Sequence, residues 1–201
     1  MRKKRPSKPI ISLERVWDIQ DYLKTKNERD YILFVLGVTT GYRAGDLVKL
    51  QVRNIREAIE RKEFVIFEGK KMNSKNIREK NRKPRRVELL PGVAKILHDY
   101  IQGKPEFDYV FKSRKGLNNH IGVKAASNIL HEAGLYFGLE QISAHSMRKT
   151  YAYKIYNDND KDILIVKELL GHSSIEETKL YLGLDQEKYH QYSKTLNDFV
   201  R

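Results

Sequence analysis

The chain has 201 residues, enough to bury a sizeable core, and its 39 Lys and Arg against 26 Asp and Glu give a formal charge of +13 at pH 7. It contains no cysteine, which excludes thiol catalysis, disulfide bonds and thiolate metal sites, and nothing in the composition indicates a metal or another cofactor. The longest apolar run, residues 31–38, is too short to span a bilayer, so we expect a soluble, cytoplasmic protein that does not bind membranes.

A basic tail, residues 1–11, precedes the first predicted helix, for which Ser12 is a good N-cap. The apolar side of this helix is expected to carry four residues, Leu13, Val16, Trp17 and Leu23. A second helix ends at Gly41, which places Arg43 in a turn between two packed helices. Helical periodicity covers most of the chain, in segments at about residues 12–24, 28–39, 45–50, 93–101, 121–133, 144–157, 162–170, 174–182 and 186–199.

Two predicted strands, residues 63–67 and 86–90, flank the most basic part of the chain. Residues 69–86 hold nine basic residues and one acidic residue, and residues 1–8 hold five basic residues and no acidic one. The other 175 residues balance at 25 basic against 25 acidic. We therefore expect a small antiparallel sheet with a long basic hairpin tip, and a polyanion that is held at two places. The alternative is that both segments are solvated and flexible.

Four short stretches contain the residues that indicate chemistry. They are Thr40-Gly-Tyr-Arg43, His145-Ser-Met-Arg148, Leu170-Gly-His172 and the single residue Tyr181. Guanidinium groups neutralise the non-bridging oxygens of a phosphate, imidazoles move protons near neutral pH, and a hydroxyl side chain can hold phosphorus covalently. Taken singly, each residue has an ordinary explanation as a core, capping or surface residue. Taken together, they indicate an enzyme that cuts and rejoins DNA.

The order and context of these stretches resemble the tyrosine recombinase (phage integrase) family. Its three boxes read roughly Thr-Gly-Leu-Arg-x-Ser-Glu-Leu, His-x-Leu-Arg-x-Thr and Leu-Gly-His-x-x-x-x-Thr-x-x-Tyr, and the likeness spans about residues 12–195. It implies an α+β, mainly α class, with a helical catalytic domain over residues 12–201, a small antiparallel sheet and a long basic hairpin. Family members generally carry a helical core-binding domain before the catalytic one, and we expect none in this chain. It would be a catalytic fragment or a naturally short recombinase.

The resemblance also implies a role for each matching residue. Tyr181 would attack the scissile phosphorus and form a 3′-phosphotyrosyl bond, which conserves the phosphodiester energy, so no ATP or metal is needed. Its ordinary pKa near 10 makes the phenol a poor nucleophile at pH 7, and His145 would assist the proton transfer. Arg43 and Arg148 would bind the non-bridging oxygens, and His172 would donate a hydrogen bond to the same phosphate.

Two further roles are less tightly fixed by the boxes. Asp46 occupies the acidic position of the first box and is expected to orient Arg43. The family places its general acid, a lysine, in the hairpin, where Lys70 is the first choice, Lys71 the alternative, and a slip to Lys75 stays open. The other charges of the hairpin are expected to contact the DNA backbone, through Lys71, Lys75, Arg78, Arg82 and Lys83.

The predicted function is therefore site-specific recombination on double-stranded DNA, in integration, excision or resolution of a mobile element or replicon. The C-terminal helix, residues 186–199, carries an apolar stripe of Tyr189, Tyr192, Leu196 and Phe199. It would pack on its own domain or, as the resemblance implies, dock into a neighbour and build a tetramer on DNA. An accessory DNA-bending or core-binding partner would supply the clamp that the chain lacks.

Two alternatives keep the same fold. One is a non-catalytic DNA-binding protein, which predicts erosion of the polar set, although all five residues of the boxes are present. The other is a type IB topoisomerase-like enzyme that relaxes DNA alone and without choosing a site. An RNA-binding domain is a weaker alternative, because the aromatic, glycine-rich signatures of common RNA modules are missing.

Overall fold

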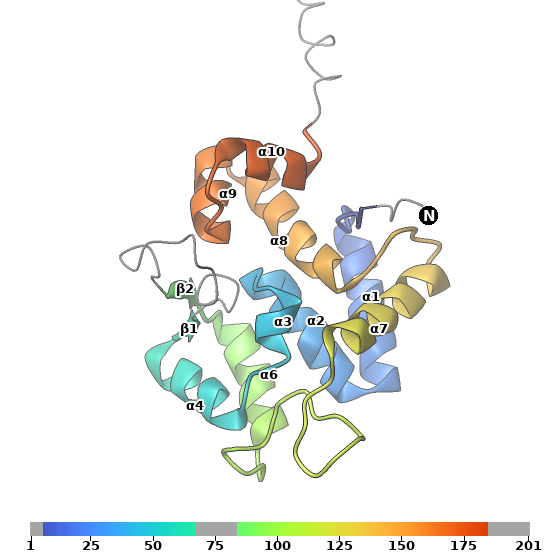
Figure 1. Ribbon diagram of the computed structural model, residues 1–201, viewed down its shortest axis with the longest axis vertical. Coiled ribbons are helices and arrows are strands. Elements are labelled where there is room, and N and C mark those ends of the chain that lie inside the picture. The colour runs from blue at the N-terminus through green and yellow to red at the C-terminus, as the bar shows by residue number, and fades with distance from the viewer. Residues whose placement is uncertain (1–5, 67–83, 185–201) are drawn as a thin grey trace, which may run out of the picture. The chain divides into compact units, whose positions relative to one another are not determined.

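The computed structural model describes residues 6–66 and 84–184, and the chain divides into two compact units, residues 1–151 and 152–201. The described part is mainly helical with one two-stranded antiparallel sheet, which confirms the predicted α+β, mainly α class (Figure 1). The elements in order are α1 Leu13–Lys26, α2 Glu28–Thr40, α3 Ala44–Leu47, α4 Val52–Arg61, β1 Glu63–Ile66, β2 Arg85–Glu88, α6 Pro91–Ile101, α7 Val123–Tyr136, α8 Ala144–Asp158, α9 Ile163–Leu170 and α10 Ile175–Leu182.

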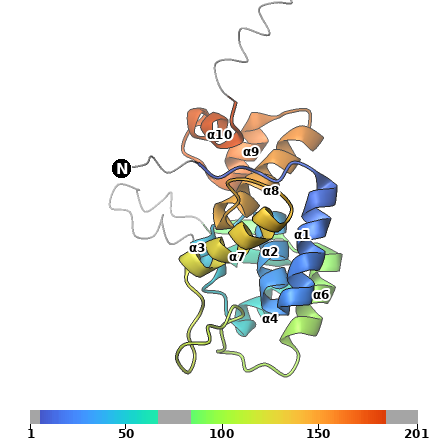
Figure 2. The same cartoon turned by 90° about the vertical axis from the view of Figure 1, so that its right-hand side faces the viewer.

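Helix α2 is the centre of the first unit. It packs against α1, α3, α6 and α7, and both views show it enclosed by these helices (Figures 1 and 2). Leu33, Phe34 and Leu36 are completely buried, as an apolar run without a polar face requires. Gly37 lets the start of α8 approach closely, since a Cβ at this position would lie 2.4 Å from the sulfur of Met147.

Helix α1 begins where the sequence predicts, with the Ser12 hydroxyl accepting a hydrogen bond from the amide of Arg15 at 3.3 Å. The predicted buried side of this helix is partly wrong. Val16 and Leu23 are buried, but Leu13 and Trp17 are 48% and 56% exposed, and Ile19 takes the buried position instead. A 3.6-residue period aligns 16, 19 and 23 on one face, and that face excludes 13 and 17.

The sheet pairs β1 with β2 so that Phe64 faces Val87 and Ile66 faces Arg85. Helix α4, directly before the sheet, is missing from the predicted elements. Its buried residues recur at helical spacing, and the Asn54 side chain accepts a hydrogen bond from the Gln51 amide at 2.9 Å, which caps its first turn. The helical spacing of the apolar residues and the capping residue Asn54 are both visible in the sequence.

The second unit contains the end of α8 followed by α9 and α10. Asp162 caps α9 by accepting hydrogen bonds from the amides of the next turn, and Ser174 caps α10 in the same way. Gly171 ends α9 in the left-handed conformation, with φ 63°. The predicted C-terminal helix at 186–199 and the hairpin tip lie outside the described residues.

Candidate active site

Arg43 lies in a turn that the sequence forces between two helices. Helix α2 ends at Gly41, whose φ of 59° and ψ of 21° are left-handed, and Arg43 then adopts an extended conformation as the N-cap of α3. A Cβ at Gly41 would lie 2.4 Å from the ring of Tyr151, so glycine is required by space as well as by conformation. The predicted place of Arg43, in a turn between two packed helices, is confirmed.

Helix α8 carries His145 and Arg148 one turn apart near its start. The Ser143 hydroxyl accepts from the amide of His145 at 3.3 Å, and the Ser146 hydroxyl accepts from the amide of Ser143 at 3.0 Å, which fixes the first turn. Arg148 is 2% exposed, and its Nη1 donates to the carbonyl oxygen of Gly41 at 2.7 Å. The second box is thereby bound directly to the first.

His145 lies at the centre of a group of positive charges. Its side chain keeps solvent access, yet partial burial, and then the charges of Lys149, Arg148 and Arg43, lower its pKa to about 4. The imidazole is therefore neutral at pH 7 and can accept a proton. Burial also lowers the pKa of Lys149, which is not among the predicted site residues.

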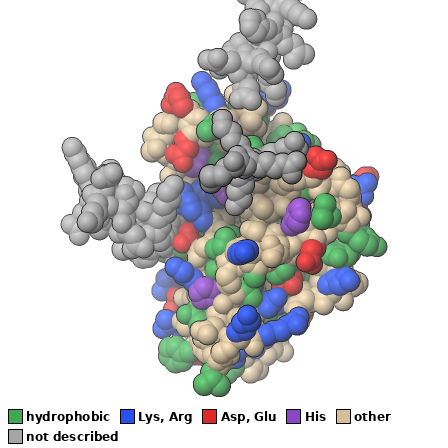
Figure 3. Space-filling view, turned by 45° about the vertical axis from the view of Figure 1, so that its right-hand side comes forward, with side chains coloured by type: hydrophobic (Ala, Val, Ile, Leu, Met, Phe, Trp, Pro, Cys, Tyr) green, Lys and Arg blue, Asp and Glu red, His purple; other side chains and the backbone are tan. Residues whose placement is uncertain are grey.

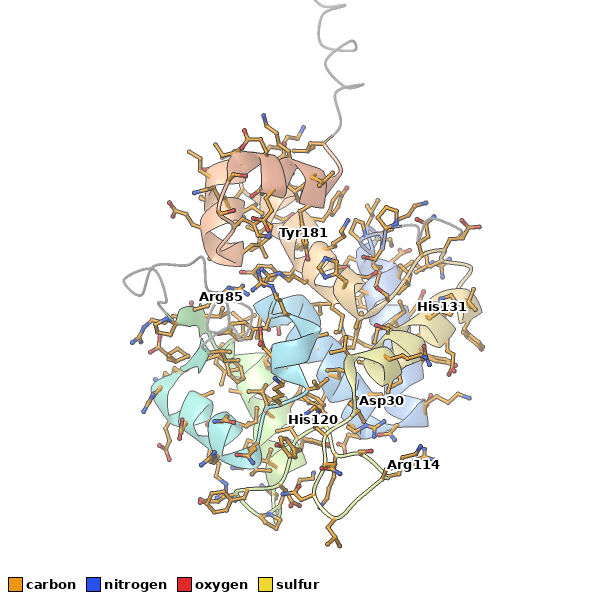
Figure 4. The ribbon with its side chains drawn as sticks, in the orientation of Figure 1. Asp30, Arg85, Arg114, His120, His131 and Tyr181 are labelled. Atoms are coloured by element: carbon orange, nitrogen blue, oxygen red, sulfur yellow. The ribbon has the colours of Figure 1, made fainter. Side chains whose placement is uncertain are left out.

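Arg85 is a second residue of this region that is not among the predicted site residues. It is 7% exposed, and it donates from Nη1 to the Gly41 carbonyl at 3.0 Å and from Nη2 to the Thr40 carbonyl at 2.7 Å (Figure 4). In the sequence it is one of nine basic residues in the hairpin segment, directly before the predicted strand 86–90, whereas the structure makes it the first residue of β2.

Asp46 follows the Arg43 turn in the first turn of α3. Its amide donates to the carbonyl of Arg43 at 2.9 Å, so the two residues are linked through the backbone. That the Asp46 carboxylate orients the guanidinium of Arg43 stays a prediction.

The second unit holds His172 and Tyr181, the latter labelled on α10 in Figure 4. His172 follows the left-handed Gly171, as predicted, and is buried; its amide donates to the Lys167 carbonyl at 3.0 Å. Its Nδ1 lies 3.0 Å from the Thr178 hydroxyl oxygen. The ring of Tyr181, which is half-buried, meets that of His172 edge to face with centroids 5.1 Å apart.

The structure thus forms two groups, each within one unit. Arg43, His145 and Arg148 come together in the first unit, and His172 with Tyr181 in the second. The predicted general acid and DNA contacts lie outside the described residues: Lys70, Lys71, Lys75, Arg78, Arg82 and Lys83.

The described residues also bear on metal binding, membrane insertion and surface charge. No three His, Asp or Glu side chains of residues 6–66 and 84–184 are arranged to hold a metal ion. None of the helices described in those ranges is long and apolar enough to cross a membrane. On the face in Figure 3, Lys and Arg are interspersed with Asp and Glu.

Comparison with known proteins gives a consistent result. Residues 11–188 match the model of the phage integrase family. The chain is 32% identical to the "probable integrase/recombinase YoeC" of Bacillus subtilis (strain 168), over 89% of this chain and 91% of that protein. It is 29% identical to a tyrosine recombinase of Pseudothermotoga lettingae and 28% identical to tyrosine recombinase XerC of Caldanaerobacter subterraneus, over 86% and 79% of this chain. Of these two relatives it covers 56% and 42%, about half their length.

Solved structures share the fold at low sequence identity. The crystal structure of XerA recombinase superposes with a TM-score of 0.66 and 19% identity, over 97% of this chain and 66% of that one. XerH recombinase bound to its difH substrate gives 0.64 and 19%, over 96% and 55%. The Tn1549 transposon integrase in complex with a circular intermediate DNA gives 0.68 and 12%, over 89% and 62%.

Proposed function

The chain belongs to the phage integrase family, and from this premise we propose that it is a site-specific recombinase that cleaves and rejoins DNA through a 3′-phosphotyrosyl intermediate. The observation that supports this most strongly is the gathering of positive charge around His145. Burial, and then the positive charges of Lys149, Arg148 and Arg43, lower the pKa of this imidazole to about 4. Three positive charges near one solvent-accessible ring favour the binding of an anion. A phosphodiester is the anion that such a pair of arginine forks fits.

The proposed reaction balances without a cofactor. The Tyr181 oxygen attacks phosphorus and gives its proton to His145, which is neutral at pH 7. The new bond joins phosphorus to the phenolic oxygen, the bond to the 5′-oxygen breaks, and a hairpin lysine, Lys70 before Lys71, protonates the leaving oxygen. Attack by a 5′-hydroxyl on the phosphotyrosine reverses these steps and rejoins the strand.

The arginines and His172 act on the charge that develops at phosphorus. Arg43 and Arg148 neutralise the non-bridging oxygens of the pentacoordinate transition state, and His172 donates a further hydrogen bond. Loss of one such donor typically lowers the rate about 10²- to 10³-fold. Arg148 suits this role because its hydrogen bond to the Gly41 carbonyl holds the guanidinium in place before the substrate arrives. Asp46 is proposed to orient Arg43.

We further propose that residues 12–201 act as the catalytic domain, preceded by the basic tail 1–11. The hairpin cations are proposed to bind the DNA backbone, and residues 186–199 to join protomers into a tetramer on DNA. An accessory core-binding or DNA-bending partner is proposed to supply further contacts with the DNA.

A nicked DNA duplex tests the proposal, because cleavage beside the nick releases a short fragment and prevents rejoining. The probe is DNA from the sequence that flanks the gene. The wild-type chain should form a covalent adduct that denaturing electrophoresis resolves, and Tyr181→Phe should form none. Tyr153→Phe, in the same unit, is the matched control and should react normally.

The outcomes separate the alternatives. No adduct with tight DNA binding would favour the non-catalytic DNA-binding protein. An adduct followed by relaxation of supercoiled DNA, without joining of two sites, would favour the topoisomerase-like enzyme. Recombinant joints between two DNA molecules are the result expected of a recombinase.

A further inference from the structure

We propose that Arg85 is a positioning residue for Arg43, because it fixes the two carbonyl groups at the end of α2 from which the Arg43 turn begins. Its effect on catalysis rests on the proposed function, whereas its effect on the turn does not. Because Arg85 is buried, it would not be among the hairpin cations that contact DNA.

The geometry of the contact is that of a fork. Two nitrogens of one guanidinium bind successive carbonyls, Nη1 to Gly41 at 3.0 Å and Nη2 to Thr40 at 2.7 Å. The Gly41 carbonyl also accepts from Nη1 of Arg148 at 2.7 Å. Two arginines from different segments therefore converge on one oxygen, two residues before Arg43, and both restrict where the turn can lie.

Helix α2 needs such donors. The last carbonyls of a helix have no partner within it, and its C-terminal end carries partial negative charge. The last turn of α2 contains no basic residue of its own, and the cations that bind its end come from other segments. Arg85 supplies one from β2, and Arg148 supplies another from α8.

Arg85 is itself held firmly. Its guanidinium carbon lies 4.8 Å from the centroid of the Tyr42 ring and 5.8 Å from that of Tyr151. The Tyr42 hydroxyl donates to the Arg85 carbonyl at 3.0 Å and lies within 3.3 Å of the Phe64 carbonyl. Side chain and backbone of Arg85 are thus both bound to the residues around the turn, which links the base of the hairpin to Arg43.

The contrast with a surface arginine is clear. Arg15 on α1 has an exposed side chain that forms an ion pair with Asp18 at 2.9 Å, a contact that solvent screens. Arg85 is 7% exposed, and lysine in its place keeps the charge but lacks the planar fork that binds two successive carbonyls at once. Arg15→Lys is therefore the matched control for Arg85→Lys.

The test compares single-turnover cleavage of nicked DNA at saturating protein with two scissile groups, a phosphodiester and a methylphosphonate. The methylphosphonate lacks the negative oxygen that Arg43 is proposed to neutralise. Arg85→Lys should lower the rate on the phosphodiester about 10- to 100-fold with DNA affinity within about twofold. On the methylphosphonate the loss should shrink to about threefold or less, as for Arg43→Ala, and Arg15→Lys should match wild type on both.

An equal loss on both substrates would show a general structural role and overturn the proposal, as would a phosphodiester rate within twofold of wild type. Should Arg85→Lys melt below the assay temperature, Tyr42→Phe replaces it. That variant loses the hydroxyl that holds the Arg85 backbone, so it should show the same substrate dependence at about 3- to 10-fold. A wild-type rate would then overturn the proposal.

A readout without DNA keeps this test separate from the proposed function. Amide hydrogen exchange at residues 42–44 should quicken about tenfold or more in Arg85→Lys (or in Tyr42→Phe) and stay unchanged in Arg15→Lys. Unchanged exchange in the Arg85 variant would overturn the positioning role even if the chain cleaves DNA. Faster exchange in a chain whose wild type forms no adduct would leave the positioning of the turn intact and contradict only the proposed function.

Discussion

The Nδ1 atom of His172 lies 3.0 Å from the hydroxyl oxygen of Thr178, which is completely buried. The Thr178 hydroxyl has one proton, and the carbonyl of Ser174, 3.2 Å away, can only accept it. The hydroxyl oxygen must then accept from His172 Nδ1–H, which fixes the tautomer and the orientation of the ring. The hydrogen bond that His172 is proposed to donate to the phosphate would then come from Nε2 of the protonated ring.

Thr178→Val should therefore disturb both stability and reaction. The substitution keeps the shape of the side chain but leaves the buried Nδ1–H without its acceptor, which costs about 1–3 kcal/mol in the free energy of unfolding. Adduct formation should fall as the ring loses its fixed orientation. Urea denaturation and the nicked-DNA assay measure these effects, with Thr178→Ser as the control that keeps the hydroxyl. Equal behaviour of the two variants would refute the hydrogen bond's role.

Acid should destabilise the chain through His145. Its pKa of about 4 in the folded state lies below the ordinary 6.5, so between these values the unfolded chain binds more protons than the folded one. The free energy of unfolding should consequently fall as the pH is lowered from 6.5 towards 4, and His145→Gln should weaken that dependence. Denaturation at a series of pH values measures it.

The cause of the low pKa can be tested directly. Burial is the largest cause, and nearby positive charges come next; Lys149→Met removes one of these charges and should raise the His145 pKa part of the way towards 6.5. Titration of the ring by NMR, with His145→Gln used to assign the signal, gives the midpoint. A midpoint near 6.5 in the wild-type chain would contradict the gathering of positive charge on which the proposed anion site depends.

Gly41→Ala should destabilise the first unit. The left-handed φ of 59° costs a residue with a Cβ about 1–2 kcal/mol, and the added atom would meet the Tyr151 ring at 2.4 Å, which adds to the loss. Gly92→Ala is the matched control, because nothing lies within 4 Å of its Cβ, and its stability should change by less than about 1 kcal/mol. Thermal denaturation of both variants measures these changes in stability. A similar loss of stability in the two variants would show that Gly41 is not conformationally required.

The general acid can be identified by changing the leaving group. A 5′-bridging sulfur leaves as a thiolate and needs no proton, so it should restore cleavage to a variant that lacks the acid. We expect Lys70→Ala to be slow on the normal substrate and near wild type on the sulfur substrate. Rescue of Lys71→Ala or Lys75→Ala instead would move the assignment to that residue.

The elements that the sequence predicts correctly are those with a strong local signal. The Ser12 cap, the end of α2 at Gly41 and the end of α9 before Gly171 each follow from residues close together in the chain. The predicted buried side of α1 is partly wrong because large apolar residues such as Trp17 also occupy surfaces, and only tertiary packing decides which face is covered.

The site shows the same difference between local features, which the sequence predicts, and long-range contacts, which it does not. The boxes place Arg43 and His172 beside their glycine turns, since those turns are local. The convergence of Arg85 and Arg148 on Gly41 joins residues 44 and 107 positions away, and no periodicity encodes a contact between them. The low pKa of His145 likewise depends on burial first and, in part, on the charge of Arg43, both of which the fold creates.

The identity of the residue that carries DNA is the most direct test of the account. The wild-type chain is incubated with nicked flanking DNA, digested with nuclease and protease, and the nucleotide-bearing peptide is sequenced by mass spectrometry. We predict a single 3′-phosphotyrosyl link at Tyr181. A link at any other residue, or DNA binding with no link at all, would contradict it.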